Sequence, residues 1–348
     1  MPSAAPMEMN LPNGSSTPSD AINTPRRWRR LAQNTVLNAA EQILGTESPK
    51  RLSVMIFHRV LPEADPFLSG DTTADEFTAV MTVVREHFNP IPLSEGVRRL
   101  QDGTLPPRAV CVTFDDGYAD NLLVAAPILK RLEIPATVFV VTGFLNGAPV
   151  WNDRLYAAMR QIPGDHVDLR DYDCGEHPIG DLVQRANLAN LLISQLKYRP
   201  AEERERIASE LATRYAPELT SPMMTREQVR QLRSEGIEIG GHTVTHPILA
   251  RIDDREAFQE IADNKDDLEG LLGERLRLFA YPNGKPGEDF APVHAVMAKR
   301  VGYEAAVTVR HGVATSKTDP FWLPRFTPWD RTPTRFALRL LLNRRHMV

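Results

Sequence analysis

The amino-acid sequence predicts an α/β fold built on a buried parallel sheet. Three short apolar runs, at 52–57, 109–114 and 136–141, have the length and composition of strands that are buried on both faces. Apolar residues recur at helical spacing between them, around 75–87 and over 121–132. Strands that alternate with helices in this rhythm are typical of parallel α/β proteins, whose functional side chains gather at the carboxyl ends of the strands.

Each further element follows from a local pattern. Asp75 is the expected N-cap of the first helix, and Thr225 is the expected N-cap of a helix that ends near Glu235. The segment 253–272 has the pattern of a long charged helix. The remaining expected elements are strands at 237–240, 276–281 and 305–309 and a helix at 292–301.

Residues 150–225 interrupt this alternation. They are polar, mostly helical in pattern, and include a dense charge run at 202–206. We interpret this segment as a helical insertion within one domain rather than as an independent domain.

The two ends of the chain differ from the domain at 48–330. Residues 1–47 begin with a stretch rich in Pro, Ser and Asn, which we interpret as a disordered tail, and continue into a basic amphipathic helix at 26–44. A second basic amphipathic helix is expected within 331–348. Each helix allows two interpretations, which are contact with an anionic membrane surface and packing of its apolar face on the domain.

Composition excludes several classes of protein. A formal net charge of −4 over 348 residues indicates no nucleic-acid partner. Cys111 and Cys174 have no metal-binding spacing, so a metal site has to use His and carboxylate ligands. No secretory signal and no run of ~18 apolar residues is found, so the cytoplasm is the expected location, with the inner membrane face as the alternative. The sequence indicates no particular oligomeric state.

The first candidate for a functional site is Asp115-Asp116-Gly117, directly after the strand at 109–114. One carboxylate of such a pair can bind a metal while its neighbour stays free as a base, and a bound cation relieves the repulsion between them. An ordinary Asp-Gly turn is the alternative, and this segment alone does not decide between the two.

The second candidate is the segment GHTVTHP at 241–247. His242 and His246 can bind one ion if the residues between them form a helical turn. Pro247 and the preceding glycines indicate an irregular loop rather than a core helix, which argues against a pair of structural histidines. One Asp with two His suits Zn²⁺ or a similar divalent ion and leaves coordination positions open for water and substrate.

Together, TFDDGYADN at 113–121 and HTVTHP at 242–247 resemble the first two signature motifs of the NodB-type polysaccharide deacetylases, carbohydrate esterase family four. The resemblance spans residues 52–328 apart from the insertion, and it implies a distorted, incomplete (β/α) barrel and a metal-dependent hydrolase. It also implies that Asp115 is the general base and that the backbone N–H of Tyr118 binds the oxyanion. The implied metal ligands are Asp116, His242 and His246, and the expected ion is Zn²⁺, with Co²⁺ or Ni²⁺ as alternatives.

The remaining family motifs are altered. Ala280 stands where the family usually has an Arg, and we expect Arg325 to supply the missing guanidinium and to keep Asp115 ionised. The residues expected to line the groove beside the metal are Tyr281, Pro282 and Asn283.

The family's late Leu-x-His motif is not found. In a branch similar to the poly-N-acetylglucosamine deacetylases, the acid histidine lies on the first strand, and His58 at the end of 52–57 fits that arrangement. The alternative for His58 is a hydrogen-bonded structural histidine. Trp151 is expected to offer a ring face to a sugar, with packing in the core as its alternative.

The expected function is therefore removal of N-acetyl groups from an amino-sugar glycan or glycolipid. One rival is an amidase or deformylase that acts on a non-polymeric substrate with the same fold. The other is a non-catalytic glycan-binding module, which would have lost the base or the metal ligands. All four of these residues are present: Asp115, Asp116, His242 and His246.

Overall fold

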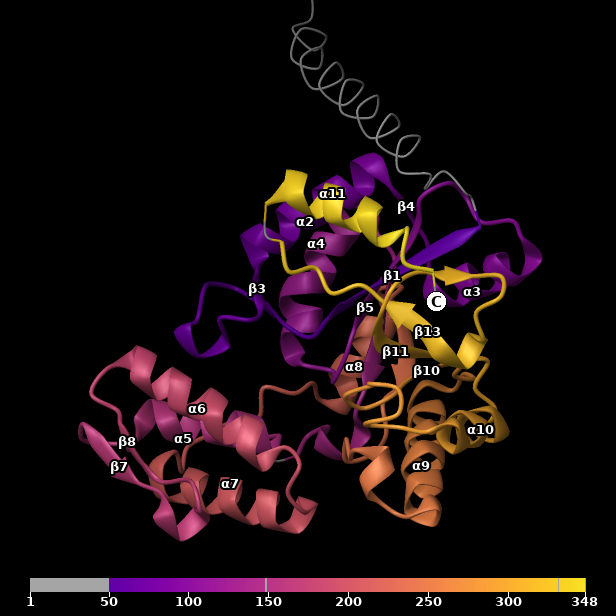
Figure 1. Ribbon diagram of the computed structural model, residues 1–348. Coiled ribbons are helices and arrows are strands. Elements are labelled where there is room, and N and C mark those ends of the chain that lie inside the picture. The colour runs from indigo at the N-terminus through magenta and orange to yellow at the C-terminus, as the bar shows by residue number, and fades with distance from the viewer. Residues whose placement is uncertain (1–49, 148, 331, 348) are drawn as a thin grey trace, which may run out of the picture. The chain divides into compact units, whose positions relative to one another are not determined.

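The computed structural model describes residues 50–147, 149–330 and 332–347. A sheet of parallel strands forms its centre (Figure 1). Neighbouring strands follow in the order β1, β5, β6, β9, β10, β11 and β13. They span Arg51–Phe57, Ala109–Phe114, Ala136–Val140, Glu238–Gly241, Leu278–Ala280, Ala305–His311 and Leu323–Arg325. Every residue of β5 is buried, as expected for a strand with partners on both sides and cover on both faces.

The sheet nearly closes on itself. Phe326, which follows β13, donates a backbone hydrogen bond to Val54 of β1 at 2.7 Å and accepts one from Ile56 at 3.1 Å. The last parallel strand therefore lies beside the first. The structure confirms the predicted distorted, incomplete (β/α) barrel.

Helices and short strands complete the barrel. A cluster of buried side chains joins α3 to β1, β5, β10 and β11. The helices of this part are α2 (Ala74–His87), α3 (Leu93–Asp102), α4 (Ala126–Arg131), α8 (Arg226–Ser234), α9 (Asp254–Leu272), α10 (Pro292–Val301) and α11 (Pro333–Asn343). The short strands are β2 (Val60–Leu61), β3 (Thr72–Thr73), β4 (Asn89–Pro90) and β12 (Ala314–Thr315). Turns of 3₁₀ helix lie at Pro66–Leu68, Thr142–Phe144, Arg170–Tyr172, Leu249–Arg251 and Pro320–Trp322.

Most boundaries agree with the sequence patterns, and three local predictions need correction. The N-cap of α2 is Thr73 rather than Asp75, because Thr73 and Glu76 form a reciprocal capping box. The helix expected over 121–132 begins as a π-helical turn, Asn121–Ala125, before α4. Strand β10 is shorter than the predicted 276–281.

The segment 150–225 folds around a cluster of its own buried side chains. It contains α5 (Trp151–Gln161), α6 (Leu182–Leu196) and α7 (Ala201–Tyr215), which lie together in Figure 1. It also contains an antiparallel hairpin, β7 (His166–Asp168) with β8 (Glu176–Pro178), which the sequence pattern did not predict. The buried cluster includes Leu155, Leu192 and Leu211, and Phe67 joins it from outside the segment.

Helix α11 packs its apolar side on the domain. Phe336, Ala337, Leu340 and Leu341 are buried, and α11 contacts α2. The predicted helix at 26–44 lies outside the described residues. Among the helices that are described, none has both the length and the apolar composition needed to span a membrane.

Candidate active site

The candidate site lies where several parallel strands end. Phe57 of β1 is in register with Phe114 of β5, so His58 and Asp115 follow at neighbouring strand ends. The N–H of His242, directly after β9, donates to the carbonyl oxygen of Val140 at the end of β6. The topology therefore brings together residues that are far apart in the sequence.

Asp116, His242 and His246 form a compact group. Asp116 Oδ1 lies 3.5 Å from Nε2 of His242 and 3.5 Å from Nε2 of His246. The two imidazole rings have centroids 4.9 Å apart and planes inclined by 71°. One ligand atom from each residue lies within 4.8 Å of the other two. Three protein ligands gathered on one side leave positions open for water and substrate, as in catalytic zinc sites.

The hydrogen bonding of His242 fits a cation at this place. Its Nδ1 lies 2.8 Å from the carbonyl oxygen of Ala280, which can only accept, so Nδ1 carries the proton of the neutral ring. Nε2 then turns its lone pair toward Asp116, and this buried atom has no hydrogen-bond partner among the described residues. Two acceptors that face each other are suited to a shared metal ion.

The three groups differ in how readily they bind protons. Burial opposes ionisation of Asp116, but the neighbouring imidazoles of His242 and His246 outweigh it and lower the pKa of this carboxyl. Burial also opposes protonation of His242, yet Asp116 and Asp115 raise its pKa above the ordinary value. Burial dominates at His246 and lowers its pKa to about 4.

The segment between the two histidines is a loop and not the helical turn that the spacing allowed. Thr243 and His246 have left-handed backbone conformations, with φ of 65° and 57°. The carboxylate of Glu260 on α9 accepts hydrogen bonds from the N–H groups of Val244 and Thr245, both at 2.8 Å. The loop is thus held by side chains rather than by helical hydrogen bonds.

Asn264 of α9 is a positioning residue that the sequence analysis missed. Its Oδ1 accepts the N–H of His242 at 3.0 Å, and its Nδ2 donates to the carbonyl oxygens of Val140 at 3.0 Å and Thr243 at 2.6 Å. A signal was present in the sequence, because Asn264 falls on the otherwise apolar stripe of α9. A polar residue at such a position has to find its partners inside the protein.

Left-handed backbone conformations cluster around the site. Asp116, Thr243, His246 and Asn283 have φ between 57° and 75° although none is glycine. Such conformations cost energy and persist where the surrounding structure imposes them, often at functional sites. Contacts with the surrounding structure therefore hold the backbone of these loops in uncommon conformations.

Asp115 is held by Arg325 in a buried ion pair. Two guanidinium N–H groups donate to the two carboxylate oxygens, each at 2.7 Å, and Nε–H donates to the carbonyl oxygen of Thr308 at 2.8 Å. Burial alone would raise the pKa of Asp115, but the charge of Arg325 outweighs it and lowers that pKa. The contact expected between Arg325 and Asp115 is therefore present.

A second group of charges surrounds Tyr118. The guanidinium carbon of Arg59 lies 4.6 Å from the centre of the Tyr118 ring, and its Nε–H donates to Asp120 at 2.8 Å. The Tyr118 hydroxyl donates a long hydrogen bond, 3.5 Å, to Asp153 of α5. Burial raises the pKa of Asp153 to about 7, against the opposing effect of Arg59. Arg59, Asp120 and Asp153 were not among the residues expected at the site.

The other expected site residues have different environments. His58 is exposed, and Trp151 and Asn283 are partly buried. Pro282 is buried, and Tyr281 is fully buried, stacked on Phe290 with its hydroxyl bonded to the carbonyl oxygen of Phe321. The side chain of Tyr281 therefore does not reach the groove that it was expected to line, because it belongs to the core.

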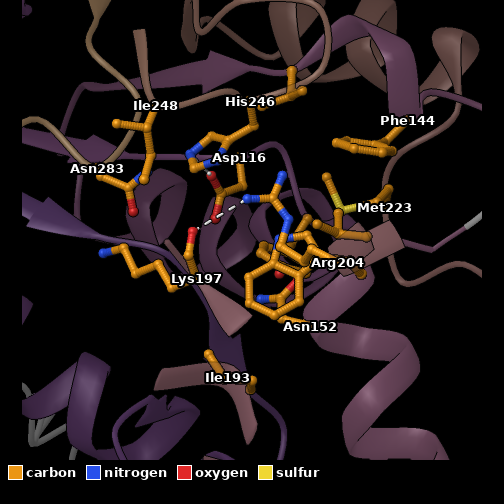
Figure 2. Close-up of a pocket in the computed structure, with 14 residues that line it drawn as sticks. Asp116, Phe144, Asn152, Ile193, Lys197, Arg204, Met223, His246, Ile248 and Asn283 are labelled. Carbon is orange, nitrogen blue, oxygen red and sulfur yellow. Dashed lines mark hydrogen bonds and ion pairs between the residues drawn. The ribbon is translucent and has the colours of Figure 1, made fainter. Parts of the chain in front are cut away.

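A cavity of about 170 Å³ adjoins the candidate metal ligands (Figure 2). Asp116, His246, Tyr118 and Asn283 line it from the barrel. The insertion contributes Trp151, Asn152, Ile193, Lys197 and Arg204. A second cavity, of about 450 Å³, contains His58 and Asp71.

Comparison with known proteins supports one family. A family model described as polysaccharide deacetylase matches residues 102–169 and 195–306, more than half of the chain. YxkH of Bacillus subtilis (strain 168), a provisionally named polysaccharide deacetylase, is 20% identical over 287 residues, which are 81% of this chain and 73% of that protein.

Solved structures show the same fold. The Streptococcus pyogenes deacetylase PplD, in complex with acetate, has a TM-score of 0.56 and 19% identity, over 84% of this chain and 97% of that one. IcaB from Ammonifex degensii has a TM-score of 0.54 and 19% identity, with the same two coverages. The matched family model, together with a barrel that carries an Asp and two His at its strand ends, shows that this chain belongs to the polysaccharide deacetylase family.

Proposed function

We propose that this chain is a metal-dependent hydrolase that removes N-acetyl groups from an amino-sugar glycan. One observation carries the proposal. Asp115 is ionised and held by Arg325. Its chain neighbour, Asp116, has Oδ1 3.5 Å from Nε2 of both His242 and His246. A base beside a set of metal ligands is what metal-assisted amide hydrolysis requires.

The metal ligands are Asp116, His242 and His246. One carboxylate and two imidazoles suit Zn²⁺, with Co²⁺ and Ni²⁺ as alternatives. When bound, such an ion polarises the acetamide carbonyl and makes water a stronger nucleophile at neutral pH. The hydrogen bond from His242 Nδ1 to Ala280 keeps the other ring nitrogen available for the ion.

Asp115 acts as the general base. Because the charge of Arg325 lowers its pKa despite burial, the carboxylate is ionised at neutral pH. The two hydrogen bonds from Arg325 fix the orientation of both oxygens, and each oxygen keeps a lone pair that can accept a proton from the attacking water.

His58 gives a proton to the leaving amine, and the backbone N–H of Tyr118 stabilises the oxyanion. The register of β1 with β5 supports the role of His58, because it places this exposed residue beside Asp115. A histidine on the first strand also supports membership of a branch similar to the poly-N-acetylglucosamine deacetylases. Trp151 and Asn283, which both line the cavity, contact the sugar.

The glycan is lipid-linked in this proposal, and the chain meets it at a membrane surface. Helix α11 supports the membrane contact, because it exposes Leu338 and Leu342 beside Arg335 and Arg339. Flotation with anionic liposomes tests this part separately. The full chain should float with the liposomes, whereas a chain that stays in the soluble fraction would contradict membrane contact and leave the hydrolase proposal intact.

Acetate release tests the hydrolase. N-acetylglucosamine oligomers and an aryl acetate are incubated with metal-free chain and with chain loaded with Zn²⁺, Co²⁺ or Ni²⁺. We expect metal-dependent release that is lost in Asp115→Asn and His242→Ala and kept in Asp75→Asn, a control on the exposed surface of α2.

Bound metal is measured in the same samples. His242→Ala should lose the ion, and Asp115→Asn should keep it. Wild-type metal content in His242→Ala would contradict the ligand assignment. Release from the aryl acetate alone would favour an amidase or deformylase, and binding of oligomers without metal or hydrolysis would favour a glycan-binding module.

A further inference from the structure

The insertion places two cations in the cavity beside the candidate metal ligands. Arg204 comes from α7, and Lys197 follows directly after α6. Figure 2 shows Arg204 and Lys197 among the side chains that line this cavity together with Asp116 and His246. The cavity is therefore lined both by candidate metal ligands and by two positively charged side chains.

Arg204 is buried without a counter-ion. The residue is 7% exposed, and no carboxylate of the described chain lies within ion-pair distance of it. One of its N–H groups donates to the carbonyl oxygen of Lys197 at 3.4 Å, and its guanidinium carbon lies 5.0 Å over the ring of Trp151. Its Nε is buried and has no hydrogen-bond partner among the described residues.

Neighbouring arginines of the insertion are paired. The distance from the guanidinium Nη1 to the nearest carboxylate oxygen is 2.9 Å for Arg154 with Glu205, 2.9 Å for Arg199 with Glu203 and 3.0 Å for Arg206 with Glu210. Carboxylates of α7 thus pair with these side chains, whereas Glu205 acts on Arg204 only from beyond ion-pair distance. Leaving a buried charge unpaired costs free energy, unless a ligand supplies the opposite charge.

Lys197 adds a second positive charge. Its side chain is half-buried, and burial lowers its pKa. Asp289 and Glu288 act on it at longer range and Lys285 opposes them, but none forms an ion pair with it in the part of the chain that the structure describes. Lys197 is therefore also free to contact an anion.

Asn152 offers a hydrogen-bond acceptor to a polar ligand in the same cavity. It lines the cavity, and its buried Oδ1 accepts no hydrogen bond from any described residue. A sugar hydroxyl or amide N–H would satisfy it.

From this arrangement, and resting on the deacetylase function proposed above, we infer that the substrate is an acidic amino-sugar glycan. An oxyanion next to the acetylated sugar, either the carboxylate of an acidic sugar or a phosphate ester, binds Arg204 and Lys197. The acetamide then lies against Asp115 and the candidate metal ligands. Asp116 does not compete for Arg204, because its neighbours are the two histidines.

Three substrates distinguish the sources of the anion. The first is neutral N-acetylglucosamine tetramer. The second is an oligomer that alternates N-acetylglucosamine with glucuronic acid, which presents carboxylates, and the third is N-acetylglucosamine 1-phosphate. With metal-loaded wild-type chain, we expect kcat/KM for at least one acidic substrate to exceed that of the tetramer about tenfold or more. Equal or higher kcat/KM for the tetramer would overturn the inference while leaving the deacetylase function in place.

The variants Arg204→Gln and Lys197→Gln test the residues. Loss of a charge-assisted contact should reduce the preference for the acidic substrate about tenfold to a hundredfold. Arg206→Gln is the matched control, because it lies on the same helix, is exposed and is paired with Glu210. An unchanged preference in both test variants would overturn the inference. If Arg204→Gln does not fold, Arg204→Lys and Lys197→Gln carry the test.

Measurements of direct anion binding test the inference even if no substrate is hydrolysed. Calorimetry measures binding of the uronic-acid oligomer and of inorganic phosphate to the full chain. We expect about tenfold weaker binding of one of these two anions in Arg204→Gln and an unchanged value in Arg206→Gln. Equal binding of both anions by wild type and Arg204→Gln would show that Arg204 does not form an anion site.

Discussion

Asp115 and Arg325 are 210 positions apart in the chain, yet they share two parallel hydrogen bonds of 2.7 Å. Both side chains are almost fully buried, and the carbonyl oxygen of Thr308 accepts the remaining Nε–H of Arg325. A carboxylate in such an environment stays ionised because the guanidinium is in place. This guanidinium comes from β13, where the sequence analysis expected a substitute for the Arg that is replaced by Ala280.

Removing that guanidinium should change both pH dependence and stability. The pKa of Asp115 lies below its ordinary value, so its pairing stabilises the fold above the unfolded-state pKa and is lost as pH falls through the folded-state pKa. In Arg325→Met the pKa should rise, the acidic limb of kcat/KM should move to higher pH, and unfolding at pH 7 should become easier by about 3–5 kcal/mol. A pH–rate profile and denaturant titration measure these changes. Arg98→Met, on an exposed pair with Asp102, is the control, and an unmoved acidic limb would argue against Asp115 as base.

Asn264 should control the metal site without touching the ion. In Asn264→Leu, the N–H of His242 and the carbonyl oxygens of Val140 and Thr243 each lose one hydrogen bond. We expect metal affinity to fall about tenfold to a hundredfold and stability to fall by about 1–3 kcal/mol. Competition with a chelator measures the affinity, with Asn187→Leu on the exposed surface of α6 as control. Wild-type affinity in Asn264→Leu would show that the loop holds its ligands unaided.

Local patterns predicted most of the elements and the centre of the site. The strand at 109–114 and the helix at 292–301 agree with β5 and α10 because burial and capping act over a few neighbouring residues. The contact between Arg325 and Asp115 could also be predicted, because the family resemblance required a guanidinium for that carboxylate.

What could not be predicted depends on contacts between distant segments. Neither Arg204 nor Asp153 belongs to a motif, and each matters only because the insertion brings it beside the barrel. Tyr281 was expected to end a strand and to line the groove, but it follows β10 and its side chain stacks on Phe290, and no sequence pattern fixes that direction. The spacing of His242 and His246 likewise fits a helical turn or a loop held by Glu260.

Metal binding should weaken on acidification in two stages. The ligands have to be deprotonated, and the pKa of His242 is raised above its ordinary value while that of His246 is lowered to about 4. As pH falls below the pKa of His242, affinity for Zn²⁺ should drop about tenfold per pH unit, and His246 should add to this only near pH 4. Chelator competition from pH 4 to pH 8 measures the slope. Affinity that does not change with pH would exclude proton competition at His242.

Asp153 should make the metal-free fold less stable at high pH. Its pKa is raised to about 7 by burial, so between the ordinary pKa and that value the folded chain keeps a proton that the unfolded chain releases. Stability should therefore decline as pH rises through this window, by up to about 1.4 kcal/mol per unit, and Asp153→Asn should remove the decline. Denaturant titrations at pH 5 and pH 8 measure the difference, with Asp75→Asn as an exposed control. Parallel pH curves for wild type and Asp153→Asn would contradict this account.

The contribution of His58 to the rate should depend on the leaving group. An amine leaves an amino sugar only after it gains a proton, whereas an aryl oxide leaves an aryl ester without one, so a general acid helps the first reaction far more than the second. In His58→Gln, we expect kcat for N-acetylglucosamine oligomers to fall about 10²–10⁴-fold, with a much smaller loss for an aryl acetate. His166→Gln, an exposed substitution in β7, is the matched control. Equal losses on both substrates would point to a structural or metal-site role for His58, because either defect impairs attack on both acyl groups alike.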